Sequence, residues 1–91
     1  MLTRADRPTA DDVLAVVRAA IGVVLERDED SLDRSTTFAE LDADSLGLVE
    51  VAEIVEEELS SFSSTPLHIP DADLEALRTV GDVVDYVLAR L

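Results

Sequence analysis

Apolar residues recur every three or four positions in separate stretches of the chain, which is the spacing of a buried helical face. The first set comprises Val13, Leu14, Val17, Ala20, Ile21, Val24 and Leu25. Just before it, Thr9 can cap a helix and Asp12 can reach back in a capping box. We therefore expect a first helix that runs from this cap to about Glu26. Gly22 inside it either permits close packing of another helix or weakens the last turns.

A second helix is predicted to start at Asp44 or Ser45, which are consecutive N-cap candidates, and to end near Ser60. Its apolar residues are Leu46, Leu48, Val49, Val51, Ala52, Ile54, Val55 and Leu59. Residues 71–78, with an acidic first turn, predict a short third helix. A second capping box at 79–82 predicts a last helix up to Leu91. Its apolar stripe consists of Val83, Val84, Val87, Leu88 and Leu91.

The connections between these helices differ in character. Residues 27–44 are polar but carry Leu32, Phe38 and Leu41, so we expect a long ordered loop with three buried anchors. Residues 60–68 lack periodicity and predict an extended, flexible loop, and residues 1–8 predict a flexible N-terminal segment. No β pattern is present. We expect an all-α bundle of four helices, three main ones and a short third one, in a single domain that covers residues 1–91.

We predict separately the burial of each of the four side chains with an aromatic or imidazole ring. Phe38 should lie in the core, and Phe62 should be either a satellite contact or an exposed lid. Tyr86 should pack its ring on the edge of the bundle and leave its hydroxyl in water. His68 should be exposed and without a chemical role.

Composition narrows the classes of function. The chain has 21 Asp and Glu against 7 Lys and Arg, a formal net charge of −14, which repels nucleic acids and anionic membranes and attracts basic proteins or cations. With no Cys and one His, the chain excludes disulfides, thiolate catalysis and thiolate metal sites, and we expect no metal centre. It shows no signal peptide and no membrane-spanning run. We expect a cytoplasmic monomer with a small core and no deep catalytic cleft.

The second helix concentrates negative charge on one face. At 100° per residue, Glu50, Glu53 and Glu57 lie opposite the core face, and Glu56 lies at the border of that arc. Leu46 lies on the same arc, away from the core. Carboxylates at these spacings repel one another, and the chain has no Lys to offset them. The arc is either a solvated face or a docking surface for basic partners.

Ser45 stands at the start of the second helix, where a side chain usually serves as a cap. Nucleophilic catalysis by Ser45 is excluded, because no nearby base in the sequence could activate it. A covalent phosphodiester on this serine would place its anion at the positive end of the helix dipole. Capping and modification both stay open on the residues alone.

Residues 38–46, Phe-Ala-Glu-Leu-Asp-Ala-Asp-Ser-Leu, followed by an acidic helix, resemble the attachment region of acyl carrier proteins. Residues 69–73 and 79–87 resemble the start of the third helix and the fourth helix of that family. The resemblance implies that Ser45, preceded by Asp44, receives a 4′-phosphopantetheine arm from coenzyme A through a phosphopantetheinyl transferase. The arm's thiol would hold acyl groups as thioesters, and the interior of the bundle would shelter them.

The resemblance also implies that the protein is a carrier and not an enzyme, in fatty acid or polyketide and natural-product biosynthesis. Its partners would be acyl-loading, condensing and tailoring enzymes with basic surfaces. The docking residues expected from the resemblance and the helical wheel are Leu46, Val49, Glu50, Glu53, Glu56 and Glu57. The chain starts with Met1 and ends soon after the last helix, so we expect the free-standing type.

Four features depart from the family pattern. Gly47 stands where an acid is common, and Asp42 replaces a common glycine. Glu53 occupies a position that is frequently apolar, and the 60–68 link is longer than usual.

Two other functions compete with a carrier. Asp42, Asp44, Gly47, Val49 and Glu53 fall at positions 1, 3, 6, 8 and 12 of an EF-hand calcium loop, although Leu46 replaces the ligand at position 5. An unmodified acidic helical interaction module would explain the charged face but not the long anchored loop. Replacing Ser45 by Ala would separate such a module from a carrier.

Overall fold

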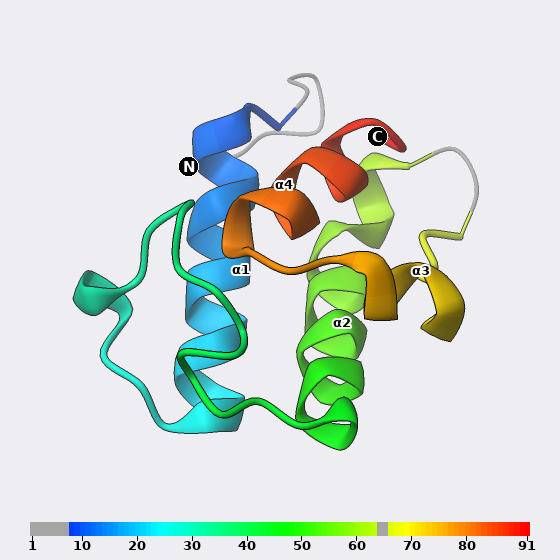
Figure 1. The fold of residues 1–91 in the computed structure, drawn as a ribbon. Helices are drawn as coiled ribbons and strands as arrows, with labels where there is room; N and C mark the ends of the chain where they lie inside the picture. The colour runs from blue at the N-terminus through cyan, green and yellow to red at the C-terminus, as the bar shows by residue number, and fades with distance from the viewer. Residues whose placement is uncertain (1–7, 64–65) are drawn as a thin grey trace.

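The computed structural model describes residues 8–63 and 66–91 and places four α-helices in this part of the chain (Figure 1). They are α1 (Ala10–Leu25), α2 (Ser45–Leu59), α3 (Asp71–Ala76) and α4 (Val80–Leu88). Two 3₁₀ turns, η1 (Glu29–Ser31) and η2 (Ser60–Phe62), lie in the connections. Among the described residues, the one β-type pairing is an isolated bridge between Thr37 and Thr79. The prediction of an all-α bundle is confirmed, and no described helix is long and apolar enough to cross a membrane.

Both predicted capping boxes are present. At α1, Asp12 N donates to Thr9 Oγ1 at 3.2 Å and Thr9 N donates to Asp12 Oδ2 at 2.9 Å. At α4, Asp82 N donates to Thr79 Oγ1 at 3.1 Å and Thr79 N donates to Asp82 Oδ2 at 3.1 Å. The pKa of Asp82 is lowered, because the N–H groups of Arg78 and Thr79 donate to its carboxylate. Reciprocal bonds of this kind satisfy amide groups that a helix start leaves without partners.

The core forms where α1 packs against both α2 and α4, which lie on the same side of it in Figure 1, with α4 nearer the top of the view. α1 contributes Val13, Val17, Ala20 and Ile21, the core face that its periodicity predicts, while Val24 and Leu25 are only half-buried. From the other helices and the connections, the buried side chains include Val51, Ala52, Val55, Leu59, Leu67, Ile69, Leu74, Val80, Val83, Val84 and Val87.

The long loop between α1 and α2 is held by its three predicted anchors, because Leu32, Phe38 and Leu41 are all buried. Its backbone also pairs with the segment that joins α3 to α4. Phe38 N donates to Arg78 O at 3.0 Å, and Val80 N donates to Thr36 O at 2.9 Å. The expectation of an ordered loop is confirmed.

Two helices end earlier than their sequence patterns predict. α3 stops at Ala76, because Leu77 and Thr79 have extended backbones and residues 78–80 hydrogen-bond to the long loop. α4 stops at Leu88 and continues only as a turn, since Ala89 and Arg90 are exposed and have no core to face. Apolar spacing persists beyond the point where tertiary contacts stop supporting the helix.

The predicted flexible segments are only partly described. Residues 1–7 and 64–65 lie outside the described residues, and Pro8 is buried. The 60–68 link is more ordered than expected around the gap, because it opens with the η2 turn and buries Leu67. Phe62 is half-buried against the core, which makes it a satellite contact.

Tyr86 corrects a further expectation. Its hydroxyl donates to Asp73 Oδ2 at 2.5 Å and does not point into water as the amphipathic character of Tyr predicts. Its ring is half-buried and lies under the guanidinium of Arg90, 3.5 Å from the ring centroid. An acceptor on the neighbouring helix therefore replaces solvent as the partner of the hydroxyl.

Candidate functional site

The first turn of α2 is capped by Asp44 and not by Ser45. Asp44 Oδ1 accepts from Gly47 N at 2.7 Å, and Asp44 O accepts from Leu48 N at 3.0 Å. Asp44 has the extended backbone of an N-cap, and Ser45 is the first helical residue. Because Asp44 performs the capping, the exposed Ser45 hydroxyl is left available.

The residues before Ser45 form a fixed turn over the Phe38 anchor. Asp42 N donates to Ala39 O, and Ala43 N donates to Phe38 O at 3.1 Å. Asp42 adopts a left-handed backbone with φ of 53°, a conformation that glycine adopts without strain and that Asp tolerates better than most residues. This conformation explains why a turn residue that is commonly glycine can be Asp here.

Gly47 is buried where α2 meets the end of α1. A Cβ atom at this position would lie 3.2 Å from Asp44 Oδ1 and 3.2 Å from Leu25 Cδ2. The close approach leaves little room for a side chain beside the capping carboxylate. Packing against α1 therefore favours glycine where an acid is common in the family.

A phosphodiester on Ser45 fits this end of the helix. Gly47 N is occupied by Asp44, whereas the N–H groups of Ser45 and Leu46 have no acceptor among the described residues. Such free N–H groups, together with the helix dipole, favour an anion at a helix N-terminus. The donors and the exposed hydroxyl thus match the requirements of an attached phosphate.

An apolar groove of about 80 Å³ opens beside Ser45, between α2 and α3. Its lining residues are Ser45, Leu48, Val49, Asp71, Leu74 and Glu75. The last three have the i, i+3, i+4 spacing of one helical face, a signal that was present in the sequence. The spacing could not reveal which helix this face meets, because that depends on how the chain folds back.

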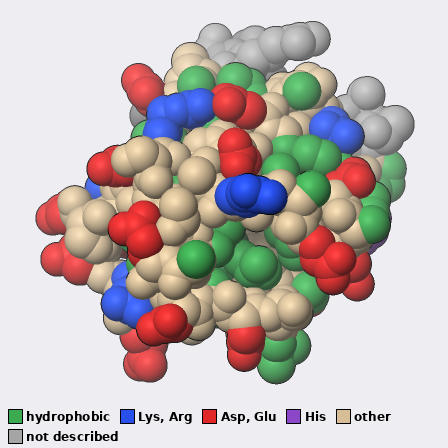
Figure 2. Space-filling view, in the orientation of Figure 1, with side chains coloured by type: hydrophobic (Ala, Val, Ile, Leu, Met, Phe, Trp, Pro, Cys, Tyr) green, Lys and Arg blue, Asp and Glu red, His purple; other side chains and the backbone are tan. Residues whose placement is uncertain are grey.

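Three predicted docking carboxylates form one exposed surface, which we call the acidic stripe: Glu50, Glu53 and Glu57. Leu46, at 67% exposure, stands at the Ser45 end of α2, and Val49 is half-buried in the groove. Val23 of α1, which lies outside the apolar set that predicts this helix, is 73% exposed and borders a hollow that it shares with the stripe. On the face in Figure 2, red carboxylates are widely spread and blue basic groups are fewer.

Glu56 is placed differently from the stripe. Its side chain is 17% exposed, and Glu56 Oε2 accepts from Ile69 N at 2.6 Å. The same oxygen lies 3.3 Å from Nδ1 of His68, whose side chain is exposed as expected. The Glu56 carboxylate therefore holds the segment that leads into α3 by a hydrogen bond.

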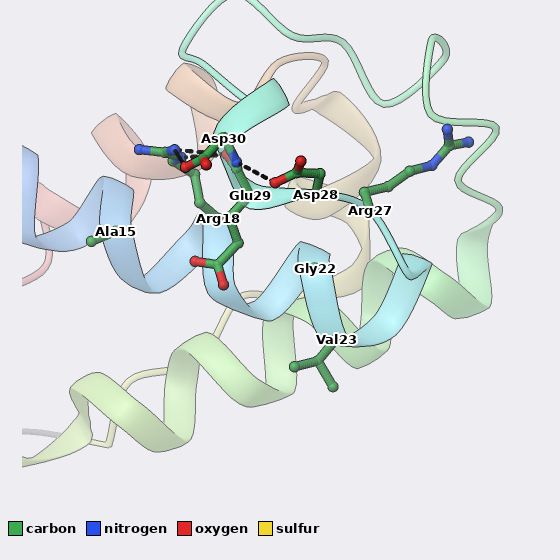
Figure 3. A pocket seen from close by; sticks show the side chains of 8 residues that line it. All are labelled: Ala15, Arg18, Gly22, Val23, Arg27, Asp28, Glu29 and Asp30. Atoms are coloured by element: carbon green, nitrogen blue, oxygen red, sulfur yellow. Dashed lines mark hydrogen bonds and ion pairs between the residues drawn. The ribbon is translucent and has the colours of Figure 1, made fainter.

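A larger hollow, of about 580 Å³, lies between α1 and η1 and is distant in sequence from Ser45 (Figure 3). Arg18 reaches across it, where Nε and Nη2 donate to Glu29 O at 3.0 and 2.7 Å. Gly22 lines the same hollow, and a Cβ there would lie 3.2 Å from Arg27 O. These groups hold the start of the long loop against α1. Gly22 thus allows this loop, and not another helix, to approach α1 closely.

The calcium-loop alternative is wrong. An EF-hand needs a 12-residue loop, whereas the residues from Ser45 to Glu53 belong to the continuous helix α2. One carboxylate oxygen of Asp44 already accepts a hydrogen bond from Gly47 N. No group of three or more His, Cys, Asp or Glu side chains gathers to hold a metal ion within the described residues.

Comparison with known proteins identifies the family. The family model "Phosphopantetheine attachment site" matches residues 15–87. An acyl carrier protein of Clostridium perfringens is 44% identical over 64 residues, covering 69% of this chain and 76% of that one. Acyl carrier proteins of Chlamydia muridarum and Lactobacillus acidophilus are 38% and 35% identical, covering 88% and 85% of this chain and 92% and 90% of theirs. The chain therefore belongs to the acyl carrier protein family, whose cofactor is 4′-phosphopantetheine.

Proposed function

We propose that Ser45 carries the phosphopantetheine arm and that the protein delivers acyl groups between enzymes. The observation that carries this proposal is the division of roles in the first turn of α2. Asp44 caps the helix, so Ser45 is exposed and has no structural hydrogen bond in the described structure. A residue placed at a helix start without capping it is available for modification.

The attachment step needs only a hydroxyl from this chain. The Ser45 oxygen forms the new phosphoester bond, adenosine 3′,5′-bisphosphate leaves from coenzyme A, and the transferase removes the hydroxyl proton. The thiol of the arm holds the acyl group as a thioester, which supplies the sulfur chemistry that a chain without Cys lacks. The chain has no Lys, and its one His pairs with Glu56, so we propose that it catalyses no step itself.

The acidic stripe supports docking on enzymes with basic surfaces. Glu50, Glu53 and Glu57 are exposed on the helix that Ser45 starts, and Leu46 adds an apolar contact beside the serine. Val49 would contribute only its exposed edge, and Glu56 only after it releases Ile69. The proposed partners are the phosphopantetheinyl transferase and acyl-loading, condensing and tailoring enzymes of fatty acid or polyketide synthesis. Complementary charge raises the association rate and orients such partners.

Intact-mass spectrometry tests the attachment site. The purified apo protein is incubated with coenzyme A, Mg²⁺ and a broad-specificity phosphopantetheinyl transferase. We expect one phosphopantetheine increment, lost in Ser45→Ala and retained in Ser61→Ala, a control that changes an exposed serine in η2. If both variants kept the increment, the arm would be attached to a residue other than Ser45. If the wild type gained no increment, the proposal would be contradicted.

Charge reversal tests the docking surface. Glu57→Arg should lower kcat/KM of transfer by the phosphopantetheinyl transferase by roughly tenfold and weaken its salt dependence, with an unchanged circular dichroism spectrum. Glu58→Arg is the matched control, because Glu58 is exposed on the same helix but lies outside the acidic stripe, in a different hollow that Ala15 and Ala19 of α1 line. Equal kinetics for both variants would remove the acidic stripe from the docking surface.

A further inference from the structure

α3 is the least firmly packed helix beside the Ser45 groove. It has six residues, and Leu74 is its one buried side chain. Glu56 of α2 binds Ile69 N just before α3 begins. On the other side, the Tyr86 hydroxyl of α4 donates to Asp73 at 2.5 Å. α4 cannot follow α3 easily, because it packs on α1 through fully or nearly fully buried valines.

The two sides of α3 therefore have different tasks. Asp71, Leu74 and Glu75 line the groove toward α2, whereas Asp73 reaches toward Tyr86 on α4. In Figure 1, α3 lies beside α2, and the link from α3 to α4 runs across the bundle. Any shift of α3 away from the groove changes its position relative to Tyr86.

The groove is too small for a long chain while α3 stays in place. Its volume of about 80 Å³ is roughly half of the ~150 Å³ cavity that admits a benzene molecule. A short acyl group fits this space, and a longer one requires α3 to move outward. Because α4 stays on α1, that movement separates Asp73 from Tyr86.

We propose that the Tyr86–Asp73 hydrogen bond is a specificity-determining latch, which opposes sequestration of acyl chains too long for the groove beside Ser45. This inference rests on the proposed attachment of the arm to Ser45. Tyr86 and Asp73 act on the acyl chain only through the position of α3, and they do not touch the thioester.

Tyr86 reports on the latch directly, because it is the single tyrosine of a chain without Trp. Its pKa is raised because the hydroxyl donates to Asp73 and is partly desolvated, while Arg90 opposes the rise. The tyrosinate absorbance of the protein therefore titrates one group. Arms that carry acetyl or dodecanoyl groups in amide linkage survive the alkaline titration.

We expect the holo and acetyl forms to titrate with the raised pKa, and the dodecanoyl form to titrate close to the ordinary value of about 10. The variant Asp73→Ala should titrate close to that value in every form. A dodecanoyl form that titrates like the holo form would show that the latch stays closed, and it would overturn the proposal.

Melting temperatures give a second, independent test with Tyr86→Phe, which keeps the ring. The holo variant should melt roughly 4 °C below the holo wild type, whereas the two dodecanoyl forms should melt together because loading has already broken the bond. If the hydrogen bond persisted on loading, Tyr86→Phe would lower the melting temperatures of the holo and dodecanoyl forms equally, which would contradict the latch. Arg34→Gln, which removes an ion pair on α4 away from α3, should lower both forms equally.

Mass spectrometry separates this test from that of the proposed function. Failure to load Ser45 with any arm contradicts the proposed function. Successful loading with unchanged titration and melting differences contradicts the latch alone.

Discussion

α3 and α4 follow each other in the chain but are held in different ways. α4 buries Val80, Val83, Val84 and Val87 against the bundle and starts with a complete capping box. α3 buries only Leu74, and its N-cap residue Pro70 offers no side-chain hydrogen bond. Burying an aliphatic side chain contributes about 1.5–3 kcal/mol, whereas a net hydrogen bond contributes about 0.5–1.5 kcal/mol. The bundle thus combines a well-packed frame of α1, α2 and α4 with a small helix, beside the proposed attachment site, that fewer buried contacts hold.

The largest expected effect comes from removing matched aliphatic groups in the frame and in α3. Ile21→Ala should lower the free energy of unfolding by about 2–5 kcal/mol, because Ile21 is fully buried in α1. Leu74→Ala should cost less globally, since α3 can separate while the frame stays folded. Urea unfolding measures the global free energy of unfolding of both variants, and amide hydrogen exchange measures the local opening of α1 and α3. Equal global losses, or fast exchange in α1 of Leu74→Ala, would place α3 within the cooperative frame.

Glu56 offers a smaller perturbation, confined to the start of α3. Glu56→Ala leaves the amide of the buried Ile69 without its acceptor, which should cost about 1–3 kcal/mol. Glu56→Gln keeps an acceptor oxygen and should lose less. We expect faster amide exchange in residues 69–76 of the alanine variant, with the exchange of α1 unchanged. Unchanged exchange in α3 would show that Glu56 does not hold it.

These contrasts also show which features the sequence could predict. The helices, both capping boxes and the Leu32, Phe38 and Leu41 anchors follow from spacing and local hydrogen bonding, which act within a few residues. The exposure of the acidic stripe follows from the periodicity of α2. Local patterns also placed two cap candidates side by side at 44 and 45. Only the bond from Gly47 N to Asp44 separates their roles.

Contacts between distant residues could not be predicted. Glu56 lies on the border of the charged arc, and the approach of Ile69 N, 13 residues later, turns its carboxylate inward. The pair of Tyr86 and Asp73 likewise depends on how α3 folds back against α4. The groove beside Ser45 combines residues from both sides of the 60–68 link, so its lining becomes visible only in three dimensions.

A backbone change at the end of α1 should stabilise the frame without affecting α3. Glu26 ends α1 with a left-handed φ of 54°, which is costly for a residue with a Cβ atom. Glu26→Gly should raise the free energy of unfolding by up to about 1 kcal/mol after the greater entropy of unfolded glycine is subtracted. Asp42→Gly, at the second left-handed position among the described residues, should gain less, because Asp tolerates this conformation. Thermal unfolding ranks the two variants, and a larger gain at position 42 would contradict the ranking.

Salt should produce the smallest effect, acting on the frame through the acidic stripe. Glu53 lies three residues after Glu50 and four before Glu57, and each such pair of like charges costs a few tenths of a kcal/mol. With a net charge of −14, screening at about 0.15 M NaCl should raise the melting temperature by roughly 1–3 °C. Glu53→Gln removes the carboxylate common to both pairs, so this variant should gain less from salt than the wild type. Scanning calorimetry at low and moderate ionic strength measures both, and a flat or falling wild-type melting temperature would rule out repulsion as the cause. If the stripe destabilises the helix that carries it, folding alone does not account for three like charges on this face, because folding favours mixed charges there, whereas the proposed docking on basic partners does account for them.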